Sequence, residues 1–169
     1  MLFRSLVELG HRAIAHVDGG SLPGAAERRD GYRRAMHSHG LDEHLDVLPG
    51  DYTEESGARA ARELLSRRNR PTGVLAGADP CAAGLLETLV RSDVHAPGDI
   101  SVVGYDDSRT AGLSYLDLTS VRQDAQALAQ AAVHAAAERL DEKRTTDRER
   151  VLTPTLTVRG STGPPPGEP

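Results

Sequence analysis

The sequence PGDISVVGYDD, residues 97–107, decides how the fold of this chain is interpreted. Its centre, Ile100–Tyr105, is short, uncharged and rich in β-branched residues, which is the composition of a buried strand. A proline and a glycine precede this centre, and Asp106 and Asp107 follow it. Turn-forming residues on one side and acidic residues on the other mark the two ends of the strand. The stretch therefore predicts an interior strand with polar side chains at its carboxyl end.

Similar units precede this strand along the chain. Short apolar runs alternate with segments of helical periodicity, an order typical of a parallel sheet covered by helices. The predicted strands are Ile14–Val17, Val47–Leu48 and Val74–Ala76; the predicted helices are 25–38, a segment capped by Thr53 and stopped by Pro71, and a segment that begins with Asp79 as N-cap before Pro80. The fold class that follows is α/β, a doubly wound parallel sheet with flanking helices.

The pattern changes in the last third of the chain. The predictions there are a strand at 118–121, a helix from 124 to about 140, a charged linker at 141–150, a strand at 151–158 and a disordered tail at 163–169. Pro154 cannot donate a hydrogen bond to a neighbouring strand. The last strand should therefore lie at an edge of the sheet.

The composition of the 169 residues is that of one globular domain, with 38% hydrophobic residues, 27% charged residues and a net charge of -5. Arginines alternate with acidic residues, so the sequence has no basic patch of the kind that binds nucleic acid. Cys81 is the only cysteine, which excludes an internal disulfide and a zinc site built from thiols. We find no signal sequence and no membrane span, and we expect a cytoplasmic protein without a membrane partner.

Polar or aromatic residues follow each predicted parallel strand. In open α/β sheets ligands bind beyond the carboxyl ends of the strands, so one crevice could collect all of these residues. They are Asp18, Asp51, Tyr52, Asp79, Asp106 and Asp107. Other roles compete with this one, since Asp18 suits a turn and Asp79 suits a helix cap better than a ligand contact. A metal-binding or acid–base pair at Asp106 and Asp107 is disfavoured, because adjacent side chains on a loop usually point apart.

Catalytic signatures are missing from the sequence. The only lysine, Lys143, lies far from the predicted strand ends, and His37 and His39 stand two positions apart on a helix, where side chains face different ways. We find no phosphate-binding loop, dinucleotide fingerprint or nucleophile elbow. We therefore expect no catalytic residues, no metal site and no cofactor, and we interpret the chain as a binding protein and not an enzyme.

A series of motifs, taken in order, resembles the LacI/GalR family of bacterial transcription regulators. The segment 97–107 is highly specific for this family, and the resemblance covers about Leu6 to Thr162. The other motifs are LGHRAIA at 9–15, RRDGY at 28–32, GDYT at 50–53, PTGV at 71–74 leading to Ala78 and Asp79, and LTSVRQ at 118–123. Two positions depart from the family, because Ala78 replaces a common asparagine and Gly24 stands where many members carry a polar side chain.

The resemblance implies a two-lobed, periplasmic-binding-protein-like fold, of which residues 1–162 are mainly the C-terminal lobe and 118–150 cross towards an absent N-terminal lobe. It also implies a small effector in the cleft, which we expect to be a sugar. A homodimer would bind operator DNA only through an N-terminal helix-turn-helix domain that we do not find in this sequence. The implied effector contacts are Arg28, Tyr52, Asp79, Asp106 and Gln123. Arginine and aspartate can bind neighbouring hydroxyls, and an aromatic ring can cover the apolar face of a sugar.

Two other interpretations stay open. A fragment of a periplasmic sugar-binding transport protein would share the fold, and a small α/β hydrolytic or phosphoryl-transfer enzyme would need a nucleophile that we do not find. We also expect the chain to dimerise or aggregate, because Val121, Leu128 and Val133 would lack the lobe that normally covers them.

Overall fold

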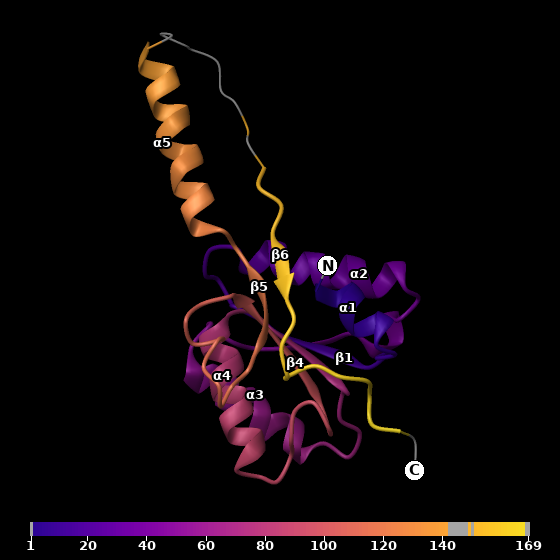
Figure 1. Ribbon diagram of the computed structural model, residues 1–169. Coiled ribbons are helices and arrows are strands. Elements are labelled where there is room, and N and C mark those ends of the chain that lie inside the picture. The colour runs from indigo at the N-terminus through magenta and orange to yellow at the C-terminus, as the bar shows by residue number, and fades with distance from the viewer. Residues whose placement is uncertain (1, 142–148, 150, 168–169) are drawn as a thin grey trace.

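A six-stranded sheet forms the centre of the computed structural model, which describes residues 2–141, 149 and 151–167 (Figure 1). The strand order is β2-β1-β3-β4-β5-β6, with β1 (Ile14–Val17), β2 (Asp46–Leu48), β3 (Gly73–Ala76), β4 (Ser101–Asp106), β5 (Thr119–Arg122) and β6 (Thr155–Thr157). The first five strands are parallel, and β6 pairs antiparallel with β5 at the edge. The predicted doubly wound parallel sheet is thereby confirmed.

Helices cover both faces of this sheet. The helices are α1 (Leu2–Glu8) and α2 (Ala25–Ser38) on one face and α3 (Glu54–Ser66) and α4 (Asp79–Val90) on the other, with a short 3-10 helix, η1 (Asp42–His44), before β2. Successive residues of β1 point to opposite faces: Ile14 packs in the cluster under α1 and α2, and Ala15 in the cluster under α3 and α4. Both faces are buried, so the strands read as continuous apolar runs.

Most predicted bounds agree with the structure. β1 and α2 have the predicted limits, and α3 begins as expected, because the Thr53 hydroxyl accepts a hydrogen bond from the Ser56 amide at 3.2 Å. Helix α1 is not predicted from the sequence, because its seven residues are too few for a helical period to show.

The start of α4 differs from the prediction. Ala78 occupies the N-cap position, and Asp79 is the first helical residue. The Asp79 carboxylate turns towards the sheet, where the amide of Ser108 and the hydroxyl of Ser120 donate to it. The interpretation of Asp79 as a helix cap is therefore wrong, although Pro80 lies in the first turn as predicted.

After β5 the chain leaves the sheet as α5 (Ala125–Asp141), which extends away from the other elements (Figure 1). Leu128 is 45% exposed and Val133 70% exposed. Val121, which we expected to be uncovered, is only 2% exposed, because β6 pairs with β5 and places Leu156 opposite it. The predicted linker at 141–150 lies almost wholly outside the described residues. None of the described helices is long and apolar enough to cross a membrane.

The C-terminal segment returns along the sheet after β6. The Gly163 carbonyl accepts hydrogen bonds from the His11 ring at 2.9 Å and the Ser101 hydroxyl at 3.0 Å, and the buried Ser161 hydroxyl donates to the Val102 carbonyl at 2.6 Å. The prediction of a disordered tail is therefore wrong at its first residue, Gly163. The last two residues of that predicted tail, 168–169, lie outside the described part.

Candidate functional site

The order of the strands places the candidate site. The chain runs outward in one direction from β1 to β2 and in the other from β3 to β5. In open α/β sheets such a reversal separates the loops at the carboxyl ends of the strands and creates the place where ligands bind. The residues that follow β1, β2 and β3 at this end include Arg28, Tyr52 and Gly77.

Arg28 is the central cation of the site. It projects from the second turn of α2, is partly buried, and donates from Nη1 to the Gly77 carbonyl at 2.6 Å. Its guanidinium carbon lies 4.9 Å from the ring centre of Tyr52 and 3.9 Å from that of Tyr105. Both distances fall within the range of an attractive cation–π contact. Arg28 is thus fixed by the protein and is not the solvated helix arginine that its sequence context alone would indicate.

Tyr52 reaches this position because two glycines make room for it. A Cβ atom added at Gly19 would lie 2.1 Å from the ring of Tyr52, and one added at Gly77 would lie 2.6 Å from it. Burial raises the pKa of the Tyr52 phenol, and the nearby Arg28 opposes that shift. Its hydroxyl is buried, and within the described part of the chain it has no hydrogen-bond partner. The Tyr52 ring therefore packs closely against the backbone at Gly19 and Gly77 and against the guanidinium of Arg28.

Asp106 and Gln123 form the second part of the site. The Gln123 amide donates to the Asp106 carboxylate at 2.8 Å, which joins the end of β4 to the residue after β5. Burial raises the pKa of Asp106, while the bond from Gln123 and the charge of Arg28 oppose this shift. Asp106 has a φ of 111°, a conformation that strains a residue with a side chain. Such strain is often found at functional sites.

Asp79 lies beneath this surface. It has no exposed area, and its two carboxylate oxygens accept from the Ser108 amide at 2.6 Å and the Ser120 hydroxyl at 2.5 Å. These bonds join the start of α4 to the loop after β4 and to β5. Asp79 is thus placed to hold Asp106 and its loop, and its carboxylate is fully buried beneath the surface of the site.

The other strand-end acids have partners of their own. The Asp18 carboxylate lies 2.5 Å from Arg29, and Asp107 forms an ion pair with Arg159 at 2.7 Å. Asp107 therefore points away from Asp106, as expected for adjacent residues on a loop. No cluster of three metal-ligating side chains occurs within the described ranges.

Sequence reasoning missed one residue of the site, Tyr105. It lies on β4 directly before Asp106, and the strand prediction treated it only as part of a buried strand. Alternation along β4 could have placed Tyr105 on the same face as Val103, the face covered by α2. No local signal indicates that Arg28 lies over its ring.

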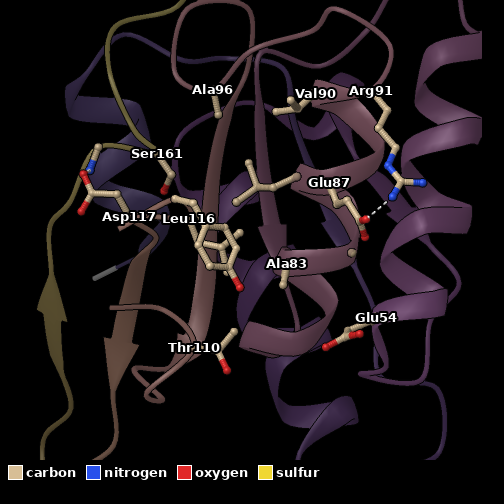
Figure 2. A pocket seen from close by; sticks show the side chains of 14 residues that line it. Glu54, Ala83, Glu87, Val90, Arg91, Ala96, Thr110, Leu116, Asp117 and Ser161 are labelled. Carbon is tan, nitrogen blue, oxygen red and sulfur yellow. Dashed lines mark hydrogen bonds and ion pairs between the residues drawn. The ribbon is translucent and has the colours of Figure 1, made fainter. Parts of the chain in front are cut away.

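A second hollow of the described structure lies away from these residues. It measures about 750 Å³ and is bounded by α4 and the loop before β5, and Figure 2 shows Glu87 and Val90 on one side of it and Leu116 on the other. None of the five predicted site residues lines it. A smaller hollow of about 400 Å³, beside α2, is lined in part by Arg28 and Tyr105.

Comparison with known proteins gives a family match and several repressors as relatives. Residues 3–162 match the periplasmic binding protein-like domain. The ribose operon repressor of Escherichia coli K12 is 34% identical over 160 residues, which are 92% of this chain and 48% of the repressor. The transcriptional repressor PurR of Erwinia tasmaniensis is 34% identical over 165 residues, which are 94% of this chain and 47% of that repressor. The chain thus spans about half the length of the curated relatives it matches.

Solved structures agree with this result. A LacI transcriptional regulator from a Rhodococcus species has a TM-score of 0.92 and 44% identity, with 98% of this chain and 61% of that chain covered. A LacI-family regulator from Enterococcus faecium with bound ribose has a TM-score of 0.86 and 27% identity, with 96% and 61% covered. The fold, the matched domain and the relatives agree, and the chain belongs to the periplasmic binding protein-like family, in the form found in LacI-type transcription regulators.

Proposed function

We propose that this chain is the C-terminal part of an effector-binding domain and binds a small, sugar-like effector at Arg28, Tyr52, Asp106 and Gln123. One observation carries the proposal: the fixed guanidinium of Arg28 and the hydrogen-bonded carboxylate of Asp106, a residue with a strained backbone, lie at the carboxyl ends of the parallel strands. Relatives support a sugar, since one represses a ribose operon and two solved structures contain ribose or cellobiose.

The chemistry of the site suits a polyhydroxylated ligand. The guanidinium of Arg28 supplies only donors, and the carboxylate of Asp106 supplies only acceptors, so together they can bind hydroxyl groups, which do both. Asp79 has a different role in the proposal, because its two oxygens already accept bonds from Ser108 and Ser120. We assign it the positioning of Asp106 and not a direct contact with the effector.

The function of the whole protein is part of the same proposal. An intact regulator would couple effector binding to operator affinity through a DNA-binding domain, and it would act in the cytoplasm without catalysing a reaction. The relatives are repressors, which supports regulation over transport or hydrolysis. A helix-turn-helix encoded upstream of Met1 would favour the regulator, and a secretion signal there would favour a transport protein.

We further propose a homodimer, as in the dimeric Lac repressor, whose structure this chain matches with a TM-score of 0.88 and 28% identity. Helical residues share a face when they are three or four positions apart, but Leu128 and Val133 on α5 are five positions apart. They therefore do not form one apolar face to which a partner could bind. The hollow beside α4 is a better candidate, because Tyr115, which is 79% exposed, stands at its rim. Under a two-fold axis each Tyr115 can enter the hollow of the partner.

Titration with sugars tests the effector site directly. Two-dimensional NMR of the chain with D-ribose and with cellobiose should shift the signals of Arg28, Asp106 and Gln123 first. Shifts confined to the hollow beside α4 would contradict this site, and an unshifted spectrum with all simple sugars would contradict a sugar effector.

A further inference from the structure

The backbone at Asp106 and Asp107 needs support from outside its own loop. These two residues follow each other at the end of β4 and have φ angles of 111° and 50°, which residues with a side chain rarely adopt. A strained backbone of this kind persists only where the surrounding structure holds it. The direction of the Asp106 carboxylate therefore depends on the contacts that anchor Asp107.

Asp107 is anchored to two other strands of the sheet. Its amide donates to the Ser120 hydroxyl of β5 at 3.0 Å, and its carboxylate accepts from the Thr157 hydroxyl of β6 at 2.8 Å. Arg159, just beyond β6, places Nη2 2.7 Å from the same carboxylate and donates from Nη1 to the Leu118 carbonyl at 2.7 Å. The Asp107 side chain is only 8% exposed, so dissolved salt screens these contacts little. Asp107 thus joins the end of β4 to a strand that comes much later in the sequence.

We propose that Asp107 is a positioning residue that ties Asp106 to β6, so that the effector site keeps its shape only while residues 155–159 are paired with the sheet. This inference deepens the proposed function and rests on it, because Asp106 is one of the proposed effector contacts. Asp107 does not touch the effector itself, since its carboxylate is bound by Thr157 and Arg159. β5 leads into α5 and β6 lies beside β5, so both strands that hold Asp107 lie at the base of the extended helix (Figure 1).

The positioning role can be measured without any ligand. In the unaltered chain the Gln123 side-chain amide donates to the Asp106 carboxylate, so its NMR signals should lie apart from those of the exposed glutamines of α5. Thr157→Val keeps the branched shape and removes only the hydroxyl, and it should move the Gln123 signals towards those of the exposed glutamines. Thr155→Val makes the same change at an exposed residue of β6 and should leave the Gln123 signals in place.

Substitutions at Asp107 itself should have the larger effect. Asp107→Ala removes the acceptor of both Thr157 and Arg159, and alanine tolerates a φ of 50° poorly, so the Gln123 signals should move furthest. Asparagine tolerates a positive φ and keeps an acceptor oxygen, so Asp107→Asn should restore most of the original position. Unchanged amide signals of β1 and β2 would show that each variant is folded. Gln123 signals that stay in place in Thr157→Val and Asp107→Ala would overturn the positioning role; if Asp107→Ala does not fold, Thr157→Val decides alone.

The link to effector binding is tested with D-ribose on the same variants. Thr157→Val should weaken ribose binding, followed by NMR titration of the full chain, by about three- to thirtyfold, the effect expected of a residue that acts on a site without touching the ligand. Thr155→Val should bind ribose as the unaltered chain does. Coupling of this kind is reciprocal, so saturating ribose should slow the hydrogen exchange of the β6 amides in the unaltered chain, and Asp107→Ala should lose this slowing.

The two measurements separate this inference from the proposed function. If ribose and cellobiose shift no signal of the unaltered chain, the sugar-binding function fails, and the Gln123 signals alone decide whether Asp107 positions Asp106. If ribose binds the unaltered chain, Thr157→Val and Asp107→Ala equally well, the proposed function stands and the tie between Asp106 and β6 is refuted.

Discussion

Among single residues, Asp79 should contribute most to holding the site together. It is fully buried and accepts two hydrogen bonds, from the Ser108 amide and the Ser120 hydroxyl. Asp79→Ala removes the acceptor of both donors, one of which, Ser120, is buried, and hydrogen bonds to a charged group are worth about 1.5 to 3 kcal/mol. We expect the free energy of unfolding, measured with urea, to fall by about that amount. Asp30→Ala, which removes an exposed carboxylate, should change it by less than about 0.5 kcal/mol.

Arg28 and Asp106 should act on affinity instead. In the intact effector-binding protein, Arg28→Ala or Asp106→Ala should weaken effector binding by about tenfold to a hundredfold, because each removes a hydrogen bond to a charged group. Both side chains are only partly buried, so thermal melts should barely change. Isothermal titration calorimetry measures the affinity. Wild-type binding in both variants would refute the site, and loss of binding together with a collapsed melt would indicate a structural role.

The residues of the site differ in how far the sequence could predict them. Tyr52, Asp106 and Gln123 lie in motifs that resemble a known family, and two of them also follow predicted strands. The role of Asp79 was predicted wrongly, because its partners Ser108 and Ser120 lie in other elements, far along the chain. The local Asp-Pro pair indicates that Asp79 could cap a helix. It cannot indicate that Ser108 and Ser120, which only folding brings near, will bind the same carboxylate.

At the scale of elements, the sequence predicts most of the strands and helices correctly. It does not predict the contacts between them. β1 and α2 have their predicted limits because turn residues and apolar periodicity mark both ends. The close approach of α3 and α4 has no such signal. A Cβ added at Gly57 would lie 1.9 Å from the carbonyl oxygen of Cys81, and one at Gly84 would lie 2.0 Å from that of Glu54. Glycine disfavours helix formation, so the sequence alone gives these two positions no favourable role. In the structure they form the surface at which α3 and α4 touch.

Two matched substitutions test this contact. Gly84→Ala should destabilise the chain by about 1 to 3 kcal/mol, because the new methyl group forces the backbones of α3 and α4 apart. Gly31→Ala in α2 should instead stabilise it by up to about 1 kcal/mol, the helix-propensity difference between alanine and glycine, since an added Cβ there meets nothing within 4 Å. Urea denaturation measures both. Equal effects of the two substitutions would contradict the close packing of α3 against α4.

For the molecule as a whole, two buried histidines should make stability depend on pH. Burial lowers the pKa of His11 and of His16 below the ordinary 6.5, so the folded chain binds fewer protons than the unfolded chain. The stability from these two groups is complete above about pH 6.5 and is lost as the pH falls below it. Urea denaturation between about pH 5 and pH 8 should show this decline. His11→Gln cannot titrate and should flatten the curve; a slope as steep as in the unaltered chain would contradict the role of His11.

Self-association is the second property of the whole molecule. Tyr115→Ser should shift sedimentation velocity profiles towards the monomer, because Tyr115 stands 79% exposed at the rim of the hollow beside α4. Val133→Ser, which removes a 70% exposed side chain from α5, should leave the profile unchanged. The reverse result would place the dimer surface on α5. A clean monomer in the unaltered chain would contradict the homodimer proposal.

The hydrogen bond from His11 to Gly163 also has a consequence for how the chain is made. Ribosomes deliver a polypeptide from its N-terminus, so His11 leaves the exit tunnel long before Gly163, which accepts its hydrogen bond, is synthesised. β6 and the segment that carries Ser161 and Gly163 likewise arrive last, and they bond to Val102 and Ser101 in the middle of the sheet. Contacts between such distant residues form slowly, because a long loop must close first. A nascent chain must therefore hold its central strand without these bonds until residues 155–163 have left the exit tunnel.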